Sequence, residues 1–390
     1  MMNEMDGKNI NNFFLIVLLY ISPIVYLTTI IVPNQYLLYA ENAAYFIFTL
    51  CLLVYNKFKF KFKTIAILVI VAIVFLTNAL LSQHPEYVIP IFINFSLILI
   101  PTLIVLDKKM DFQQVFKFWE KFALLFTVIL PVYIVLNDLR KIGYYEIGYV
   151  THVNLLFYAY LFSNFKKNFS IKNMILLILN VFCCFIFGSR SVLAAGIVVI
   201  LVAFFMFQNE RKISYYFILS AFLICGTYLY NNLAEILINI QFFINKLGFS
   251  SRNLSLFIQE LNNNEGLYLS GRDGIYPIII DHLKSSNGLP EGVGMARVLT
   301  SGNFYHAHNF LLEMLLTFGL IIGTFLIVIL LLIFVRLIFK KYKDDNNKFL
   351  CILLISFLTR SIFGTYFFQD TIFVISICLV IRLISSERSI

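Results

Sequence analysis

Charged residues are scarce in this 390-residue chain, because Asp, Glu, Lys and Arg together make up only 13% of it. Hydrophobic residues make up 60%, and the mean hydropathy of +0.87 is far above that of a soluble globular domain. This composition excludes an ordinary water-soluble protein and predicts an integral membrane protein.

The motifs of several common cofactor sites are also missing. The sequence contains no CxxC or HExxH and no Walker or Rossmann glycine pattern, so the usual motifs for zinc, ATP and dinucleotides are absent. The six cysteines lie in apolar runs, where cysteine behaves as a small hydrophobic residue. No carboxylate or cysteine spacing completes a ligand set around His306 and His308. We therefore expect no disulfide framework, no metal and no cofactor.

Long apolar runs, by contrast, are abundant. Runs of about 17 to 22 residues recur along the chain, and each is long enough to cross the hydrocarbon core of a bilayer. They predict an all-α polytopic integral membrane protein with about twelve transmembrane helices. The sixth run contains His152 and Asn154, and the last is short. No small-residue cleavage site follows the first, so we expect no cleaved signal peptide. The runs begin near Phe13, Tyr36, Thr64, Tyr87, Trp119, Val150, Met174, Val192, Tyr215, Phe318, Leu350 and Thr371.

Basic residues indicate the orientation, because short loops rich in Lys and Arg stay in the cytoplasm. If both termini are cytoplasmic, most of the 30 basic residues fall in inner loops, whereas all five histidines fall near the outer face. The net charge of +9 then reflects topology, and we expect the lipid bilayer but no nucleic acid as a partner. Any chemistry is expected at the outer face.

Residues 231–305 form the one sizeable soluble stretch, which this orientation places outside. Apolar residues recur at helical spacing in 236–243 and 254–261, which predicts short helices on the membrane surface. Turn-rich pieces follow and predict loops rather than a packed domain. We therefore expect one membrane domain, with nine spans in residues 1–230, this large extracytoplasmic loop in 231–305 and three spans in 306–390.

Three short motifs lie at the predicted outer face. They are "FGSRSVLAAG" around Arg190, "YLSGRDGIYP" around Arg272 and "YHAHNFLLEMLLTFGLIIG" around His308, with a "GVG" turn between the last two. Their order, together with the large outer loop before the final spans, resembles the O-antigen ligase and Wzy-type polysaccharide polymerase superfamily. The resemblance covers roughly residues 187–323.

The resemblance implies metal-independent, inverting transfer of a glycan from a polyprenyl diphosphate carrier. It implies that Arg190 and Arg272 hold the diphosphate and that His308 activates the acceptor hydroxyl. The residue types suit these roles, because guanidinium groups bind phosphate bidentately and stay protonated, and imidazole accepts protons near neutral pH. The simpler alternatives are a border arginine that reaches lipid headgroups at 190, a solvated Arg272 paired with Asp273, and a polar helix start at His308 that Asn309 caps.

Other side chains are weaker candidates, with His306, Asn309 and Glu313 as supporting residues. Arg252 in "SSRNLS" is another candidate for binding the diphosphate. Arg360 lies in the apolar run "ISFLTRSIFGTYFF", where a charge needs a partner or a polar cavity, and that cavity could be the saccharide path. Glu313 could orient the site, although a solvated helix carboxylate is the simpler interpretation. We expect His306 to be a neighbour rather than the base, because rings two residues apart on a helix point in different directions.

Within the superfamily the choice is between a polymerase and a ligase. A polymerase joins the chain to the next carrier-linked repeat unit, and a ligase joins it to lipid A core. The modest length and the many Phe, Ile and Asn residues are typical of polymerases of O-antigen or capsule, which we favour. The alternative from another class is a flippase or permease for lipid-linked saccharides, which usually has its charged site near the membrane midplane.

The resemblance also implies a location and partners. We expect the bacterial cytoplasmic (inner) membrane, with both termini in the cytoplasm and the active site facing the periplasm or the cell exterior. The expected partners are saccharides linked to undecaprenyl diphosphate, with the chain-length regulator and flippase proteins of the same pathway.

Overall fold

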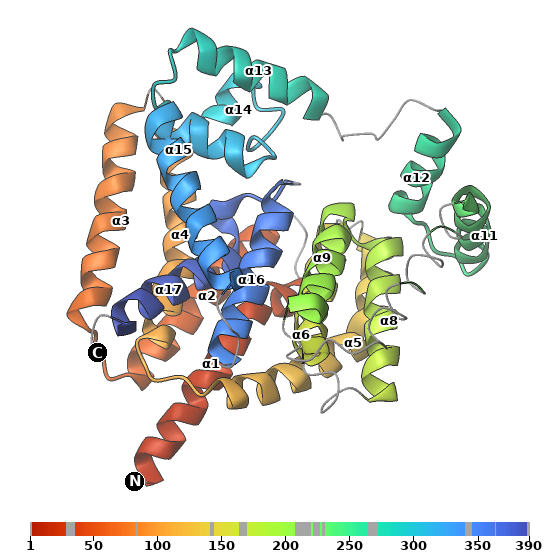
Figure 1. Cartoon of the computed structure of the whole chain (residues 1–390), viewed down its shortest axis with the longest axis horizontal. Coiled ribbons are helices and arrows are strands. Elements are labelled where there is room, and N and C mark those ends of the chain that lie inside the picture. The colour runs from red at the N-terminus through yellow and green to blue at the C-terminus, as the bar shows by residue number, and fades with distance from the viewer. Residues whose placement is uncertain are drawn as a thin grey trace. The chain divides into compact units, whose positions relative to one another are not determined.

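The chain is built from helices. A computed structural model describes residues 2–28, 36–82, 84–140, 144–163, 170–206, 220, 227, 231–263, 272–339, 345–362 and 364–387. These residues form helices and the turns that join them, with no strand among them (Figure 1). The predicted all-α class is therefore confirmed.

Exposed apolar helices identify the chain as a membrane protein. Helix α3, Phe62–Leu81, holds a 19-residue stretch of mean hydropathy 2.3 of which only 11% is buried. A surface so apolar is stable against lipid rather than water. Within the described residues, six helices are long and apolar enough to cross a bilayer. They are α1 (Met2–Leu27), α2 (Leu37–Tyr55), α3, α4 (Pro85–Leu106), α5 (Phe112–Arg140) and α15 (Phe310–Phe339).

The count of twelve spans stays a prediction. A described helix covers or adjoins every predicted run except the ninth, which begins near Tyr215 and of which the structure describes little more than Ser220 and Thr227. Three of these helices are apolar but shorter than the six, namely α8 (Ile171–Phe187), α9 (Arg190–Met206) and α17 (Thr371–Glu387).

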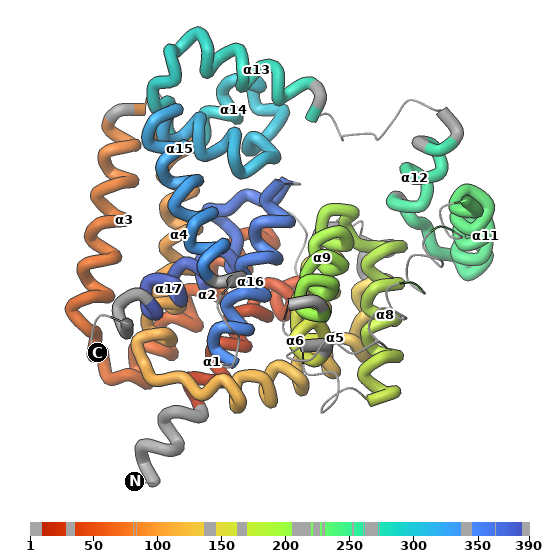
Figure 2. The backbone as a smooth tube through the Cα atoms, viewed as in Figure 1, coloured from red at the N-terminus to blue at the C-terminus, as the bar shows by residue number. Residues whose placement is uncertain are grey.

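The helices fall into two compact units, Met1–Leu125 with Gly271–Ile390, and Phe126–Ser270. In the first unit α4 is central, since α1, α2, α3 and α17 all pack against it (Figure 2). Helix α16, Asp345–Ile362, packs against α15 and α17, and its residues 347–357 are all buried.

In the second unit, α6 (Tyr144–Ser163) is the buried helix. It packs against α8 and α9. Its polar residue Asn154 donates to Oδ1 of Asn180 at 2.9 Å, and Asn180 donates to Thr127 at 2.8 Å. This network explains how the sixth apolar run tolerates a buried asparagine, because each buried amide meets a hydrogen-bonding partner.

The predicted loop 231–305 contains more helix than expected. Helices α11 (Leu233–Lys246) and α12 (Arg252–Asn263) confirm the two predicted short helices, and they lie in the second unit. The turns predicted after them are found at 286–294 and 300–303, but the expectation that this stretch is not packed is wrong, because α13 (Arg272–Ser285) and α14 (Met295–Leu299) also form there, in the first unit. Ile275, Ile279 and Leu283 recur at helical spacing along α13 and form an apolar stripe. This stripe and its partners form a small core of Ile275, Ile279, Leu283, Ala296, Ala307 and Leu316.

Helix α15 is broken at Gly319, whose φ of 77° and ψ of 169° are not helical. Leu320 donates from its backbone N–H to the carbonyl of Gly288 at 2.8 Å, and Glu291 donates to the carbonyl of Leu316 at 3.0 Å. A Cβ atom on Gly319 would lie 2.8 Å from the Gly288 oxygen. Gly323 allows close packing after this break, since a Cβ there would lie 2.7 Å from the carbonyl of Met314. Gly319 instead provides the break.

Candidate functional site

Arg272 and His308, 36 residues apart in the chain, meet at Gly364. A Cβ atom built on Gly364 would lie 2.9 Å from Nη2 of Arg272 and 3.1 Å from Nδ1 of His308. Both side chains are partly exposed. Two of the residues predicted for the site therefore lie together in the first unit, with a small residue between them that leaves both groups room.

Helix α13 positions Arg272, which is its first residue. The apolar stripe of α13 packs on Ala307, which precedes His308 in the chain, and on Leu316 of α15. Tyr276, one turn after Arg272, donates from its hydroxyl to the backbone carbonyl of His308 at 3.3 Å. The loop arginine of the sequence motif is thus held on a packed helix rather than on a solvated loop.

The backbone of His308 is unusual. Its φ of 54° lies in the left-handed region, which non-glycine residues seldom adopt and which clusters at functional sites. Asn309 follows, and its Oδ1 accepts from the N–H groups of Leu311 at 2.9 Å and Leu312 at 3.3 Å. Asn309 therefore caps α15, as one interpretation of the sequence proposed, and the cap fixes the chain direction just after His308.

His306 lies closer to His308 than predicted. The two rings meet edge to face with their centroids 4.1 Å apart, because residues 304–309 precede the helix instead of belonging to it. The expectation that the rings diverge assumed helical geometry and is wrong on this point. His306 is buried and also packs against Tyr366, with ring centroids 5.1 Å apart. Its predicted place as a neighbour of the base is compatible with this burial.

Glu313 is buried rather than solvated, which corrects the simpler interpretation of that residue. Its Oε2 accepts the backbone N–H of Ala307 at 2.7 Å. Ala307 stands between the two histidines, so this bond holds the segment that carries both of them. Glu313 has the geometry of a residue that orients the site, as the alternative prediction stated.

Burial and a neighbouring positive charge both lower the pKa values of the two imidazoles. Burial, followed by the positive charge of Arg272, lowers the pKa of His308 to about 4, although a hydrogen bond to the backbone of Gly364 acts in the opposite direction. Burial, His308 and Arg272 lower the pKa of His306 to about 3. Both rings are therefore neutral at pH 7, and a neutral imidazole has a lone pair that can accept a proton.

The influence of Arg272 on His308 gives a direct test. In Arg272→Gln, the pKa of His308 should rise toward 6.5, because a neighbouring positive charge that disfavours the imidazolium is removed. Titration of ¹³C-histidine-labelled protein by NMR measures the shift. Lys284→Gln removes an exposed charge from the same helix and should leave the pKa of His308 unchanged. An unchanged pKa in Arg272→Gln would contradict the arrangement.

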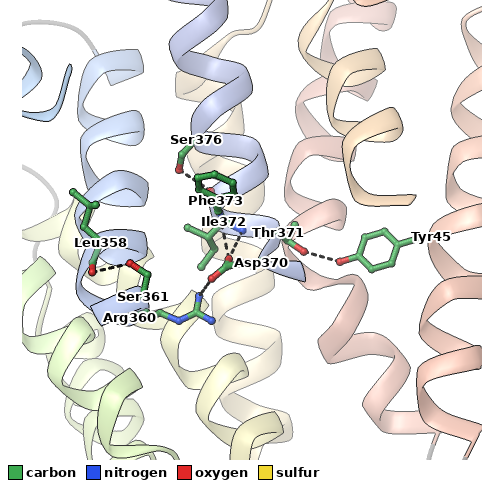
Figure 3. A network of polar contacts seen from close by, with 9 residues as sticks. All are labelled: Tyr45, Leu358, Arg360, Ser361, Asp370, Thr371, Ile372, Phe373 and Ser376. Atoms are coloured by element: carbon green, nitrogen blue, oxygen red, sulfur yellow. Dashed lines mark hydrogen bonds and ion pairs between the residues drawn. The ribbon is translucent and has the colours of Figure 1, made fainter. Parts of the chain in front are cut away.

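Arg360 has the partner that its apolar surroundings require. Its Nη1 lies 3.2 Å from Oδ2 of Asp370, and both side chains are buried. The other carboxylate oxygen of Asp370 accepts the N–H groups of Ile372 at 2.8 Å and Phe373 at 3.3 Å, so it also caps α17 (Figure 3). The expected partner is thus found, and this ion pair gives Arg360 a structural role. Its place on a saccharide path stays a prediction.

Arg190 and the segment of Arg252 lie in the second unit. Arg190 begins α9, and its guanidinium carbon lies 5.3 Å from the ring centroid of Phe257 on α12. Asn253 donates from its side chain to the carbonyl of Gly188, which ties the start of α12 to the turn before α9. The motifs around Arg190 and Arg252 are therefore neighbours. The Arg252 side chain lies outside the described residues, and binding of diphosphate by either arginine stays a prediction.

Sequence reasoning missed Gly364 and Tyr276. An isolated glycine among bulky residues, as in "SIFGTYFF", indicates a close backbone approach, and this signal could have found Gly364. Nothing local distinguishes Tyr276 from the many other tyrosines. Within the described residues, no three His, Cys, Asp or Glu side chains form a group that could hold a metal ion.

Comparison with known proteins gives this chain no family, since no protein-family model and no curated protein matches it.

Proposed function

We propose that this membrane protein is a polysaccharide polymerase, which transfers a glycan from a polyprenyl diphosphate carrier to a sugar hydroxyl of the next carrier-linked repeat unit. The observation that carries the proposal is the meeting of His308 and Arg272 at Gly364. A neutral imidazole beside a guanidinium group suits a reaction that deprotonates a hydroxyl and releases an anion. The motif order in the sequence adds the substrate class.

The bond changes follow from these two groups. The acceptor hydroxyl oxygen attacks the anomeric carbon of the donor sugar while His308 takes the hydroxyl proton. The bond from that carbon to the phosphate oxygen breaks, and its electron pair leaves with the diphosphate. Nδ1 of His308 faces Gly364, so a hydrogen bond donated there leaves Nε2 as the base. Arg272 balances the growing negative charge.

Arg190 is proposed as a second guanidinium group for the diphosphate, and Arg252 as a weaker one. Two arginines bind phosphate oxygens bidentately and remain charged throughout the reaction. We also propose the cytoplasmic (inner) membrane as the location, with the site facing outward and both termini inside, because most basic residues then lie in the inner loops.

Replacement of His308 by Ala in the cells that make the protein tests the proposal. A polymerase variant should leave single repeat units attached at the surface and no long chains. If no units are attached at all, the protein is a ligase instead. Unchanged long chains would contradict glycan transfer and favour the flippase or permease alternative.

Gly364→Ala should lower the rate of chain extension by about tenfold. An added methyl group would lie within 3.1 Å of both His308 and Arg272, and the φ of 119° at Gly364 adds strain of about 1 to 3 kcal/mol for any other residue. Extension by purified protein with a defined carrier-linked repeat unit measures the effect.

Gly274→Ala is the matched control for this variant, because nothing lies within 4 Å of its added methyl group, and alanine suits a helix. Both variants should purify with unchanged elution on size exclusion. Equal rates for Gly364→Ala and the wild type would show that the two groups do not need this space.

A further inference from the structure

Planar side chains form a row in the first unit. The guanidinium carbon of Arg297 lies 4.8 Å from the ring centroid of Tyr87 and 5.6 Å from that of Tyr305. The ring of His84 stacks on Tyr87 at 5.9 Å with an interplanar angle of 30°. Gln369 donates from its amide to the hydroxyl of Tyr305 at 3.3 Å. We call these five residues the aromatic row.

The "GVG" turn brings the members of this row together. Gly292 and Gly294 are buried with φ of 99° and 87°, and a Cβ atom on Gly294 would lie 2.9 Å from Cβ of Tyr87. The N–H of Val293 between them donates to the side chain of Asn78 at 3.0 Å. This close approach seats α14 on the α3–α4 turn and thereby brings Arg297 to Tyr87. The "GVG" motif thus positions Arg297 beside Tyr87, a role separate from the transfer chemistry.

Arg297 is equipped to bind a ligand. It is partly exposed, and within the described part of the chain it forms no ion pair. Tyrosine rings close to a guanidinium group stabilise its charge through the ring faces, whereas its N–H groups point outward in the guanidinium plane. Tyr305 is 39% exposed, so its ring also offers surface to a ligand.

The aromatic row borders the histidines. The ring of Tyr305 meets that of Tyr366 at 5.6 Å, and Tyr366 meets His306 at 5.1 Å. His306 is in edge-to-face contact with His308. Tyr305 lies three residues before His308 in the chain and is exposed, so it offers surface near His308 to the sugars that neighbour the reacting one.

We propose that the aromatic row binds the acceptor saccharide, an inference that rests on the proposed function. Tyrosine rings pack against the C–H faces of sugar rings, and the Arg297 and Gln369 donors match sugar hydroxyls. A neutral oligosaccharide suits this mixture of flat apolar faces and a few placed polar groups. An interfacial aromatic belt, the simpler explanation for tyrosines near a helix start, does not need a guanidinium group between two rings.

A binding experiment tests whether the aromatic row binds a saccharide, independently of glycan transfer. The probe is the repeat-unit oligosaccharide released from the surface polysaccharide of the same cells and carrying a short alkyl aglycone in place of the diphosphate carrier. Saturation-transfer NMR on the purified full-length protein should detect binding by the wild type and by His308→Ala. Arg297→Gln should weaken binding about tenfold, the loss expected for one hydrogen bond to a charged group. Tyr305→Ala should also weaken it about tenfold, because the ring contact with the sugar is lost.

Tyr39→Ala and Lys284→Gln are the matched controls, since they remove an exposed tyrosine and an exposed charge elsewhere. Both should bind the probe like the wild type. In extension assays with the alkyl glycoside as acceptor, Tyr305→Ala and Arg297→Gln should raise its KM about tenfold and change kcat less than about threefold.

Unchanged binding and unchanged KM in Tyr305→Ala and Arg297→Gln would overturn the assignment of the row, as would a wild-type protein that does not bind the probe. A failure of the proposed function looks different, because His308→Ala would then leave chain extension intact whatever the two row variants do.

Discussion

Arg272→Ala should slow chain extension by about 100- to 1000-fold, the loss measured when one preorganised group that stabilises developing charge is removed. This corresponds to about 3 to 4 kcal/mol of the barrier. The reason is positional, because α13 and its apolar core hold this guanidinium beside His308, where the leaving diphosphate is expected. The rate of ladder formation from carrier-linked repeat units, at saturating substrate, measures the loss.

Arg272→Lys separates charge from geometry. Lysine keeps the positive charge but cannot form two parallel hydrogen bonds to one phosphate, so it should recover only a small part of the rate. Lys284→Ala, at the far end of the same helix, should extend chains at the wild-type rate. If Arg272→Ala retains a rate within a few-fold of the wild type, the guanidinium has no role in the transfer.

His308→Ala should lower the extension rate by about 100-fold or more, the usual contribution of a positioned general base. Because burial and Arg272 lower the pKa of His308 to about 4, the wild-type kcat/KM should fall as the pH drops toward that value and stay level near pH 6.5. The residual rate of His308→Ala should lack this acid limb.

A pH profile of kcat/KM measured on both proteins checks the assignment of His308. Asn303→Ala, in the exposed turn before the histidines, is the control and should keep both the rate and the acid limb. An identical acid limb in His308→Ala would assign the titration to another group.

Much of the fold could be predicted from the composition and from the helical spacing of apolar residues. Apolar runs of membrane-crossing length predicted the helices, and the helical spacing at 236–243 and 254–261 predicted α11 and α12. Helix α13 was not predicted, because its short apolar stripe becomes evident only against its packing partners, Ala307 and Leu316. Local patterns do not specify such long-range contacts.

The site was predictable in its members but not in its geometry. Motif order singled out Arg272 and His308, which the structure brings together. The meeting point at Gly364 lies 56 residues after His308, and no spacing rule connects them. The contact between His306 and His308 arises because residues 304–309 are not helical, which a helical assumption cannot foresee. A charge in an apolar run did predict a partner for Arg360, but the identity of that partner, Asp370, came from the fold.

The most direct test of glycan transfer uses purified protein, one defined carrier-linked repeat unit and a metal chelator. We expect the wild type to form a ladder of products that grow by one repeat unit at a time, and His308→Ala to form almost none. A wild-type protein that leaves the repeat unit unchanged, or an equal ladder from His308→Ala, would contradict the proposal that His308 and Arg272 form the centre of a polysaccharide polymerase.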